Sequence, residues 1–243
     1  MLQGRPVAVL GGVRIPFCRQ NTAYADVGNL GMSVRTLGAL VEKFGLHGQQ
    51  LGEVAMGAVI KHPSDWNLGR EATLSSGLSP LTDGAAACLL GSEEWAAAHG
   101  HEVLCHLRDA QVAAVDFVHG EGLLMAPTVA VPEMLARNGL SLQDFDFYEI
   151  HEAFAAQVLC TLRAWESEEY CRNRLGLDAP LGRIDPERIN VNGSSLATGH
   201  PFAATGARIV AAAAKALKER GGGRCLVSIC TAGGMGVVAI LER

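Results

Sequence analysis

"TGARIVAAAAKALKERGGGRCLVSICTAGGMGVVAIL", residues 205–241, carries the strongest secondary-structure signals in the chain. Its alanine-rich part, 205–219, begins at Thr205, a candidate N-cap, and stops at a run of glycines, which predicts a helix. Two apolar runs rich in β-branched residues follow at 224–230 and 235–241, separated by the turn sequence TAGG. The stretch therefore predicts a helix followed by two strands.

Strand and helix patterns alternate along the rest of the chain. Strands are expected over 5–17 and 53–60, and between them a helix over 26–46 that Asp26 could cap. The other expected elements are strands at 81–90, 101–115 and 145–150 and helices at 92–100, 127–139 and 152–175. This alternation predicts an α/β fold.

Composition narrows the class of protein. The 243 residues are 49% hydrophobic and 19% charged, which is enough apolar material for a buried core. A net charge of −5, with no run of Lys or Arg longer than two, argues against nucleic-acid binding. No window reaches the roughly 18 apolar residues of a membrane span, and no secretory signal is evident. Seven cysteines without a Cys-x-x-Cys pair fit a reducing compartment, so we expect a cytoplasmic protein without a transmembrane segment.

The first candidate motif is Gly199-His200-Pro201. Glycine permits a tight turn and proline fixes the following φ, so His200 is held in one orientation. An imidazole titrates near neutral pH and can take a proton from a thiol or donate to a developing oxyanion. On its own, a histidine in a loop is more often structural than catalytic.

The second motif, YEIHEAFAA, places His151 where an expected strand passes into a helix. Ala155 stands where a zinc protease has its second histidine, so a zinc site of that type is excluded. Ligand sites in α/β sheets gather at the carboxyl ends of strands. His151 is therefore a candidate for polarising a carbonyl group or holding a water.

The third motif, SICTAGGMG, ends a strand with Cys230, and a glycine turn follows at once. Amides of such a turn can point at a ligand, and a cysteine there can give and take protons. Cys225 lies within the strand and fits a small core residue. His101, Cys105 and His106 form no expected metal site, because alternation along a strand puts His106 on the opposite face.

Together these motifs resemble a known family. HEAFAAQ (151–157), NVNGSSLATGHPFAATGAR (190–208) and CTAGGMGVVAILER (230–243) are similar to the three carboxyl-terminal signatures of the thiolases, the acetyl-CoA acyltransferases, in the family's order. The His-Glu-Ala-Phe form is most similar to the branch that contains the thiolase subunits of fatty-acid oxidation complexes. Residues 14–19, 57–80 and 82–96 resemble segments of the amino-terminal half.

The resemblance implies a layered αβαβα thiolase fold with a partial amino-terminal half over 1–97 and a complete carboxyl-terminal half over 98–243. It implies thiolytic cleavage or Claisen condensation of acyl-CoA and 3-ketoacyl-CoA thioesters. Coenzyme A would be a substrate, with no permanently bound cofactor and no metal. The expected partners are further copies in a homodimer or tetramer, or a fatty-acid oxidation complex.

The resemblance also implies roles for individual residues. His200 would activate the nucleophilic cysteine and help to bind the thioester oxygen. Cys230 would be the acid/base that moves the α-proton, and His151 would help to form the oxyanion site with a water. Gly233 and Gly234 would lie on the loop that presents amides to the substrate.

The sequence departs from the family at the nucleophile. The family's Cys-x-(Ser/Thr/Gly)-Gly pattern is absent, and the chain passes from Pro80 directly to Leu81. The family has between these points the strand and helix of the nucleophile, a further strand and an extra loop domain. Cys88 lies in an apolar strand pattern and is no substitute, so no nucleophile is identified. A truncated chain, a chain lacking an unobserved or spliced-out block, and a degenerate paralogue all fit this gap.

Loss of the covalent acyl carrier removes the two-step route of a thiolase. The alternative function is therefore a non-catalytic, thiolase-like acyl-CoA-binding protein or complex subunit. A third possibility keeps only enolate chemistry, such as deprotonation or decarboxylation, because His200 and Cys230 need no acyl carrier for that step.

Overall fold

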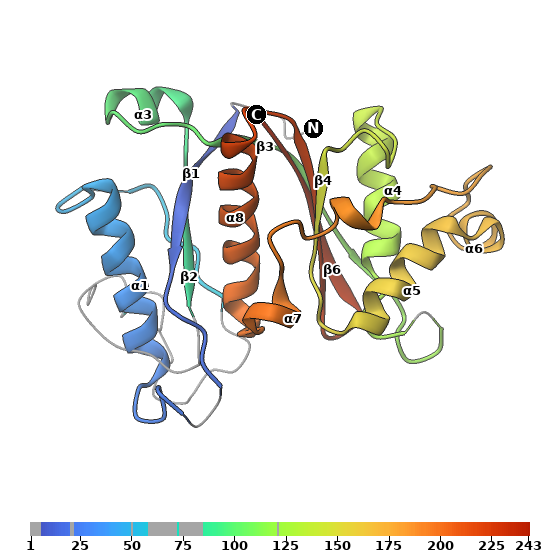
Figure 1. Cartoon of the computed structure of the whole chain (residues 1–243), viewed down its shortest axis with the longest axis horizontal. Coiled ribbons are helices and arrows are strands. Elements are labelled where there is room, and N and C mark those ends of the chain that lie inside the picture. The colour runs from blue at the N-terminus through green and yellow to red at the C-terminus, as the bar shows by residue number, and fades with distance from the viewer. Residues whose placement is uncertain (1–5, 20–21, 50, 58–71, 73–84, 121) are drawn as a thin grey trace.

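The computed structural model describes residues 6–19, 22–49, 51–57, 72, 85–120 and 122–243. They form one six-stranded sheet with the order β2-β1-β3-β6-β5-β4 (Figure 1). Only β4 and β5 pair in parallel among the described strands; the other neighbours are antiparallel. The strands are β1 (Val7–Arg14), β2 (Ala86–Gly91), β3 (Cys105–Ala114), β4 (Phe147–Ile150), β5 (Arg224–Thr231) and β6 (Met235–Glu242).

Helices cover both faces of this sheet, which confirms the α/β prediction. Val9 of β1 packs in the core beneath α8, whereas its neighbours Ala8 and Leu10 pack against α1 and α3 on the other face. Helices α4 and α5 also lie opposite α8, over the β4–β6 end. The helices are α1 (Asn29–Phe44), α3 (Glu93–Ala98), α4 (Pro127–Asn138), α5 (Ala155–Glu166), α6 (Glu168–Asn173), α7 (Ser195–Thr198) and α8 (Thr205–Glu219).

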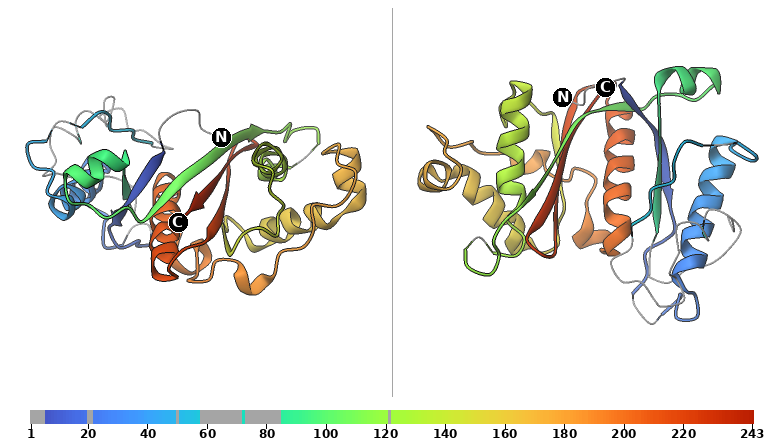
Figure 2. Two further views of the ribbon diagram at one scale, coloured as in Figure 1. Left: turned by 90° about the horizontal axis from the view of Figure 1, so that it is seen from above. Right: turned by 180° about the vertical axis from the view of Figure 1, so that it is seen from behind.

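The predicted ending of a helix and two strands is present as α8, β5 and β6. Ala213 and Ala214 of α8 are fully buried, and a Cβ on Gly12 of β1 would lie 2.7 Å from the Cβ of Ala211. Small side chains thus let α8 approach the strands closely. Seen from the front (Figure 1) and from behind (Figure 2, right), α8 lies between the β1–β2 pair and strands β4–β6.

Several local predictions were wrong. Helix α1 begins after Gly28 with no side-chain cap, so Asp26 does not cap it. Thr205 is the first residue of α8 and its hydroxyl contacts His200, so it is no cap either. The expected helix 152–175 is divided at Ser167, whose backbone is extended and whose hydroxyl accepts a hydrogen bond from the first turn of α6.

The region expected to form a strand at 53–60 shows no strand over 53–57, and 58–60 lie outside the described residues. The Pro80 to Leu81 junction also lies outside them. The strands β1 and β2, which lie on either side of this junction in the sequence, join the same sheet as the carboxyl-terminal strands, because β1 pairs with β3. The boundary between 97 and 98 stays a prediction.

Candidate active site

Two of the predicted residues, His151 and His200, meet at one end of the sheet. His151 directly follows β4, and its amide donates to the carbonyl of Ser228 on β5 over 2.8 Å. His200 lies between α7 and the start of α8. The two Nε2 atoms are 3.2 Å apart and the ring centroids 4.0 Å apart. Residues 49 positions apart in the sequence therefore form one histidine pair.

Each imidazole contacts a hydroxyl through its other nitrogen. His151 Nδ1 lies 2.8 Å from Ser195 Oγ, and Arg208 donates to the same oxygen over 2.8 Å. His200 Nδ1 lies 2.7 Å from Thr205 Oγ1. The rings are thus fixed through Nδ1 and turn their Nε2 atoms toward one another.

The surroundings keep both imidazoles neutral. Burial, with smaller contributions from the adjacent His200 and the Arg208 guanidinium, lowers the pKa of His151 to about 3. Burial and Arg208 also lower the pKa of His200. Two neutral rings 3.2 Å apart share one hydrogen bond, so one Nε2 donates and the other accepts.

A buried carboxyl lies close to the same arginine. Glu149 of β4 is 2% exposed, and its Oε2 has no hydrogen-bond partner within the described part of the chain. Burial outweighs the opposing effect of the Arg208 guanidinium and raises the pKa of Glu149 to about 7. Burial lowers the pKa of Arg208, which Glu149 opposes.

Hydrogen bonds from the Asn190 side chain position the strand end that carries His151. Asn190 has a positive φ of 50°, and its side-chain amide bonds both the N–H and the C=O of Ile150 over 2.9 Å. Together with the parallel bridge between Tyr148 and Ile189, these contacts extend the edge of β4. His151 therefore leaves the sheet in a defined direction.

Cys230 lies near the end of β5 but outside the histidine pair. It is 4% exposed, and burial raises the pKa of its thiol to about 11. Within the described residues its side chain forms no hydrogen bond with either histidine. Side chains alternate along β5, which puts Cys230 on the face of Leu226, beneath α4, while Val227 faces α8. The structure thus brings His151 and His200 together and leaves Cys230 on a neighbouring strand.

Gly233 and Gly234 form the turn between β5 and β6, with φ values of 83° and 71°. The Gly234 carbonyl accepts from the Val115 amide over 2.8 Å, which ties the turn to the end of β3. The predicted loop position of both glycines is therefore present.

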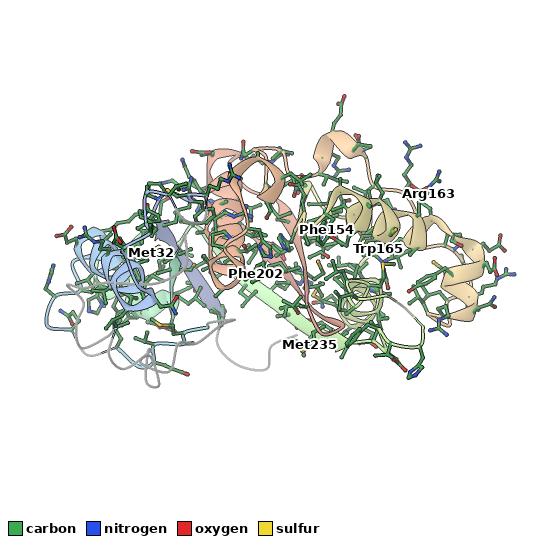
Figure 3. The ribbon with its side chains drawn as sticks, turned by 90° about the horizontal axis from the view of Figure 1, so that it is seen from below. Met32, Phe154, Arg163, Trp165, Phe202 and Met235 are labelled. Carbon is green, nitrogen blue, oxygen red and sulfur yellow. The ribbon has the colours of Figure 1, made fainter. Side chains whose placement is uncertain are left out.

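An exposed apolar side chain lies beside the histidine pair. Phe202 is 56% exposed and its ring centroid lies 4.9 Å from that of His200. Phe154 and Met235 are also more than half exposed; in Figure 3 Phe154 lies near Phe202, and Met235 lies at the lower edge. The site is thus polar at the imidazoles and apolar beside them.

The sequence patterns missed Ser195, Arg208, Glu149 and Asn190. Ser195 and Arg208 stand inside the motif 190–208, where only the histidine was singled out. For Arg208 a signal was available: a charged residue in the apolar stripe of an alanine-rich helix. A buried arginine needs polar partners, so its position indicates a polar site nearby.

No cluster suited to a metal occurs in the described ranges. His106 instead bonds Glu93 over 2.7 Å, and Cys105 is buried in the core under α8. None of the described helices is both long and apolar enough to cross a bilayer.

The family model described as "Thiolase, C-terminal domain" matches residues 101–243, more than half of the chain. The chain belongs to the thiolase family. The resemblance drawn from the three motifs is thereby confirmed.

Relatives and solved structures agree with this assignment. The 3-ketoacyl-CoA thiolase of Shewanella loihica is 44% identical over 164 residues, which cover 68% of this chain and 37% of that protein. Human mitochondrial 3-ketoacyl-CoA thiolase matches with a TM-score of 0.54 at 32% identity, over 67% of this chain and 36% of that one. The chain therefore spans well under half the length of these thiolases.

The fold has a further match in the peroxisomal 3-ketoacyl-CoA thiolase of Saccharomyces cerevisiae. The TM-score is 0.79 at 22% identity, with 100% of both chains covered. That protein is described as five α-β-α-β-α layers built from two core domains of identical topology. The thiolase-like fold class is confirmed, and the described residues of this chain supply one sheet with helices on both faces.

Proposed function

We propose that this chain provides the proton-transfer and oxyanion-binding half of a thiolase-type acyltransferase acting on acyl-CoA or 3-ketoacyl-CoA thioesters. Its thiolase relatives support the reaction class. The observation that carries the proposal is the pair of Nε2 atoms, 3.2 Å apart and next to the exposed ring of Phe202.

The pair has the properties of a base that becomes an oxyanion site. In the resting state one of the two Nε2 atoms carries no proton and can act as a base. We assign this role to His200. A cysteine thiol gives its proton to that nitrogen, and the thiolate attacks the thioester carbonyl. Both Nε2 atoms then carry protons and converge on one region. Two converging donors suit a negatively charged thioester oxygen.

Collapse of this adduct expels coenzyme A as a thiolate, which takes the proton back from His200. The lowered pKa of His200 favours this return, because the charged imidazolium is unstable once the oxyanion is gone. Apolar Phe202 beside the ring would keep water from competing and would contact an acyl chain.

Cys230 would act in the carbon–carbon step. Its raised pKa keeps the thiol protonated at neutral pH, so it would donate a proton to the leaving enolate or receive the α-proton in condensation. The turn amides of Gly233 and Gly234 would face the substrate beside it.

Coenzyme A would be bound as substrate, with no permanent cofactor. Assembly into a homodimer or tetramer is part of the same proposal, since the solved peroxisomal thiolase of Saccharomyces cerevisiae that is 35% identical over 68% of this chain is described as dimeric. Membership of a fatty-acid oxidation complex remains a proposal of the same kind.

The deciding experiment is acylation. The purified chain is incubated with acetyl-CoA and acetoacetyl-CoA, and intact mass and peptide maps locate any acyl group among the seven cysteines. Mapping across 79–82 establishes in the same run whether Pro80 is bonded to Leu81. A cysteine-bound acyl group that disappears in His200→Asn supports acyl transfer.

Acyl-CoA binding without acylation would instead favour the second candidate, a non-catalytic acyl-CoA-binding protein or complex subunit. The absence of a Cys-x-(Ser/Thr/Gly)-Gly pattern is the observation behind it. Exchange of the acetyl-CoA α-protons with deuterated water, without acylation, would mark the third reading, enolate chemistry alone. If the chain shows no acyl-CoA binding, no proton exchange and no acylation, all three functions are overturned.

A further inference from the structure

We propose that Arg208 and Ser195 fix the direction of a hydrogen-bond chain through His151 to His200, and so set which nitrogen of each imidazole carries the proton. Its link to catalysis rests on the proposed function, but the tautomers themselves do not. In this arrangement Arg208 and Ser195 are positioning residues. They act on the substrate only through the two histidines.

The chain of contacts is continuous. Arg208 donates to Ser195 Oγ over 2.8 Å, and Ser195 Oγ lies 2.8 Å from His151 Nδ1. His151 Nε2 lies 3.2 Å from His200 Nε2, and His200 Nδ1 lies 2.7 Å from Thr205 Oγ1. Thr205 in turn can donate to the Pro201 carbonyl at 3.5 Å.

Arg208 gives the chain its direction at one end. A guanidinium has five donors and no acceptor, so the serine oxygen must accept from it. The serine hydroxyl retains a single proton to donate. Within the described part of the chain, His151 Nδ1 is the acceptor that lies within reach of that proton. Ser195 is 4% exposed, so water offers little alternative.

The opposite direction leaves a buried donor unused. If His151 donated from Nδ1, Ser195 would accept from both His151 and Arg208, and its own proton would have no partner. An unpartnered buried hydroxyl destabilises the structure. The forward direction gives the protons of Ser195, the two imidazoles and Thr205 an acceptor each.

The tautomers follow from this direction. His151 accepts at Nδ1 and therefore carries its proton on Nε2, which it donates to His200. His200 accepts at Nε2 and carries its proton on Nδ1, which it donates to Thr205. His200 thus keeps an unprotonated Nε2, while His151 is a permanent Nε2–H donor. One imidazole is prepared as base and the other as oxyanion donor.

Nitrogen NMR of the full chain, labelled with ¹⁵N-histidine and measured without substrate near neutral pH, tests this directly. His151→Asn and His200→Asn variants assign the two rings among the eight histidines. We expect a protonated Nε2 and an unprotonated Nδ1 for His151, and the reverse for His200. The reverse for His151, or an averaged mixture of its tautomers, would overturn the proposal without any further variant.

Two pairs of variants separate the chain from general packing. Ser195→Ala removes the donor to His151 and should produce a mixture of His151 tautomers. Ser194→Ala removes a neighbouring buried hydroxyl that accepts from Arg208 over 3.3 Å, and we expect the histidine signals to be retained. Equal effects of the two serine variants would contradict the proposal.

The second pair changes Arg208. Lysine has only donors and should keep the tautomers, whereas glutamine can accept from Ser195 and should release them. Circular dichroism confirms that each variant folds, and the wild-type measurement decides if one does not. The NMR measurement uses no acyl-CoA, so it is independent of the acylation test. If the expected tautomers are found and no acylation occurs, this inference stands and the proposed function fails.

Discussion

Glu152 and Asn190 join two distant motifs through one carboxylate. Asn190 Nδ2 donates to Glu152 Oε1 over 2.8 Å, and Glu152 Oε2 accepts from the Leu196 amide over 2.9 Å. The residue after His151 thereby holds both ends of the segment that carries Ser195. Ser195, which contacts His151, lies within that segment.

Removing the Glu152 carboxylate is therefore expected to weaken the fold at the site. Glu152→Ala leaves two donors without their acceptor and should lower the free energy of unfolding by about 1–3 kcal/mol. Urea denaturation measures this. The control Glu169→Ala, on an exposed side chain of α6, should stay within about 0.5 kcal/mol of wild type. Equal losses in the two variants would show that the tie contributes nothing specific.

We expect the buried carboxyl of Glu149 to make the free energy of unfolding depend on pH. Its pKa is raised from 4.5 to about 7 in the folded chain, so between these values the folded state holds a proton that the unfolded state has lost. Stability contributed by this group is full below pH 4.5 and is lost as pH rises through 7. The loss reaches roughly 3 kcal/mol at one pKa unit per 1.4 kcal/mol.

Glu149→Gln removes this titration while keeping the shape of the side chain. The variant should gain stability over wild type as pH rises from 5 to 8, by up to about 3 kcal/mol. Unfolding free energies from urea titrations at several pH values give the difference. Parallel curves for the two proteins would contradict a buried carboxyl that ionises near neutral pH.

Strong local patterns explain what could be predicted from the sequence. The alanine-rich helix and the two apolar runs at 205–241 became α8, β5 and β6, because periodicity and glycine stops agree with the tertiary packing there. His151 and His200 were chosen from their motifs, and the structure brings them into contact.

Tertiary contacts explain what could not be predicted. Ser195 meets His151 from 44 residues away, and no local spacing encodes that contact. Threonine is a residue type favoured at helix N-caps, yet the hydroxyl of Thr205 contacts His200 instead. Ser167 interrupts the predicted long helix because its hydroxyl caps the next one, a choice that apolar periodicity alone does not reveal.

The turn after β5 predicts a contrast between neighbouring glycines. Both have positive φ, so alanine at either position costs about 1 kcal/mol or more. A Cβ on Gly234 would also lie 2.5 Å from the Val115 carbonyl oxygen, whereas the nearest atom to one on Gly233 is the Met235 Cε at 3.7 Å. Gly234→Ala should therefore be the more destabilising by about 1–3 kcal/mol in urea denaturation. Equal losses would mean that the turn is not packed against β3 as described.

The cysteines predict a pattern of chemical reactivity. The thiolate is the nucleophile toward iodoacetamide, and a thiol with a pKa of about 11 is ionised in only roughly one molecule in several thousand at pH 7.5. Cys230 should resist alkylation in the native chain, as should the fully buried Cys225, whereas the exposed Cys160 should react. Peptide mapping after a timed reaction measures the three sites together.

Two further arms make this test specific to Cys230. In urea its alkylation should rise to the rate of the other cysteines, and a Cys230→Ala variant confirms the peptide. In the native state its rate should rise about tenfold for each unit of pH, because the thiolate fraction does. Rapid alkylation at pH 7.5 would instead show an ionised, accessible thiol. Such a group could take a proton but could not supply one to a leaving enolate at neutral pH.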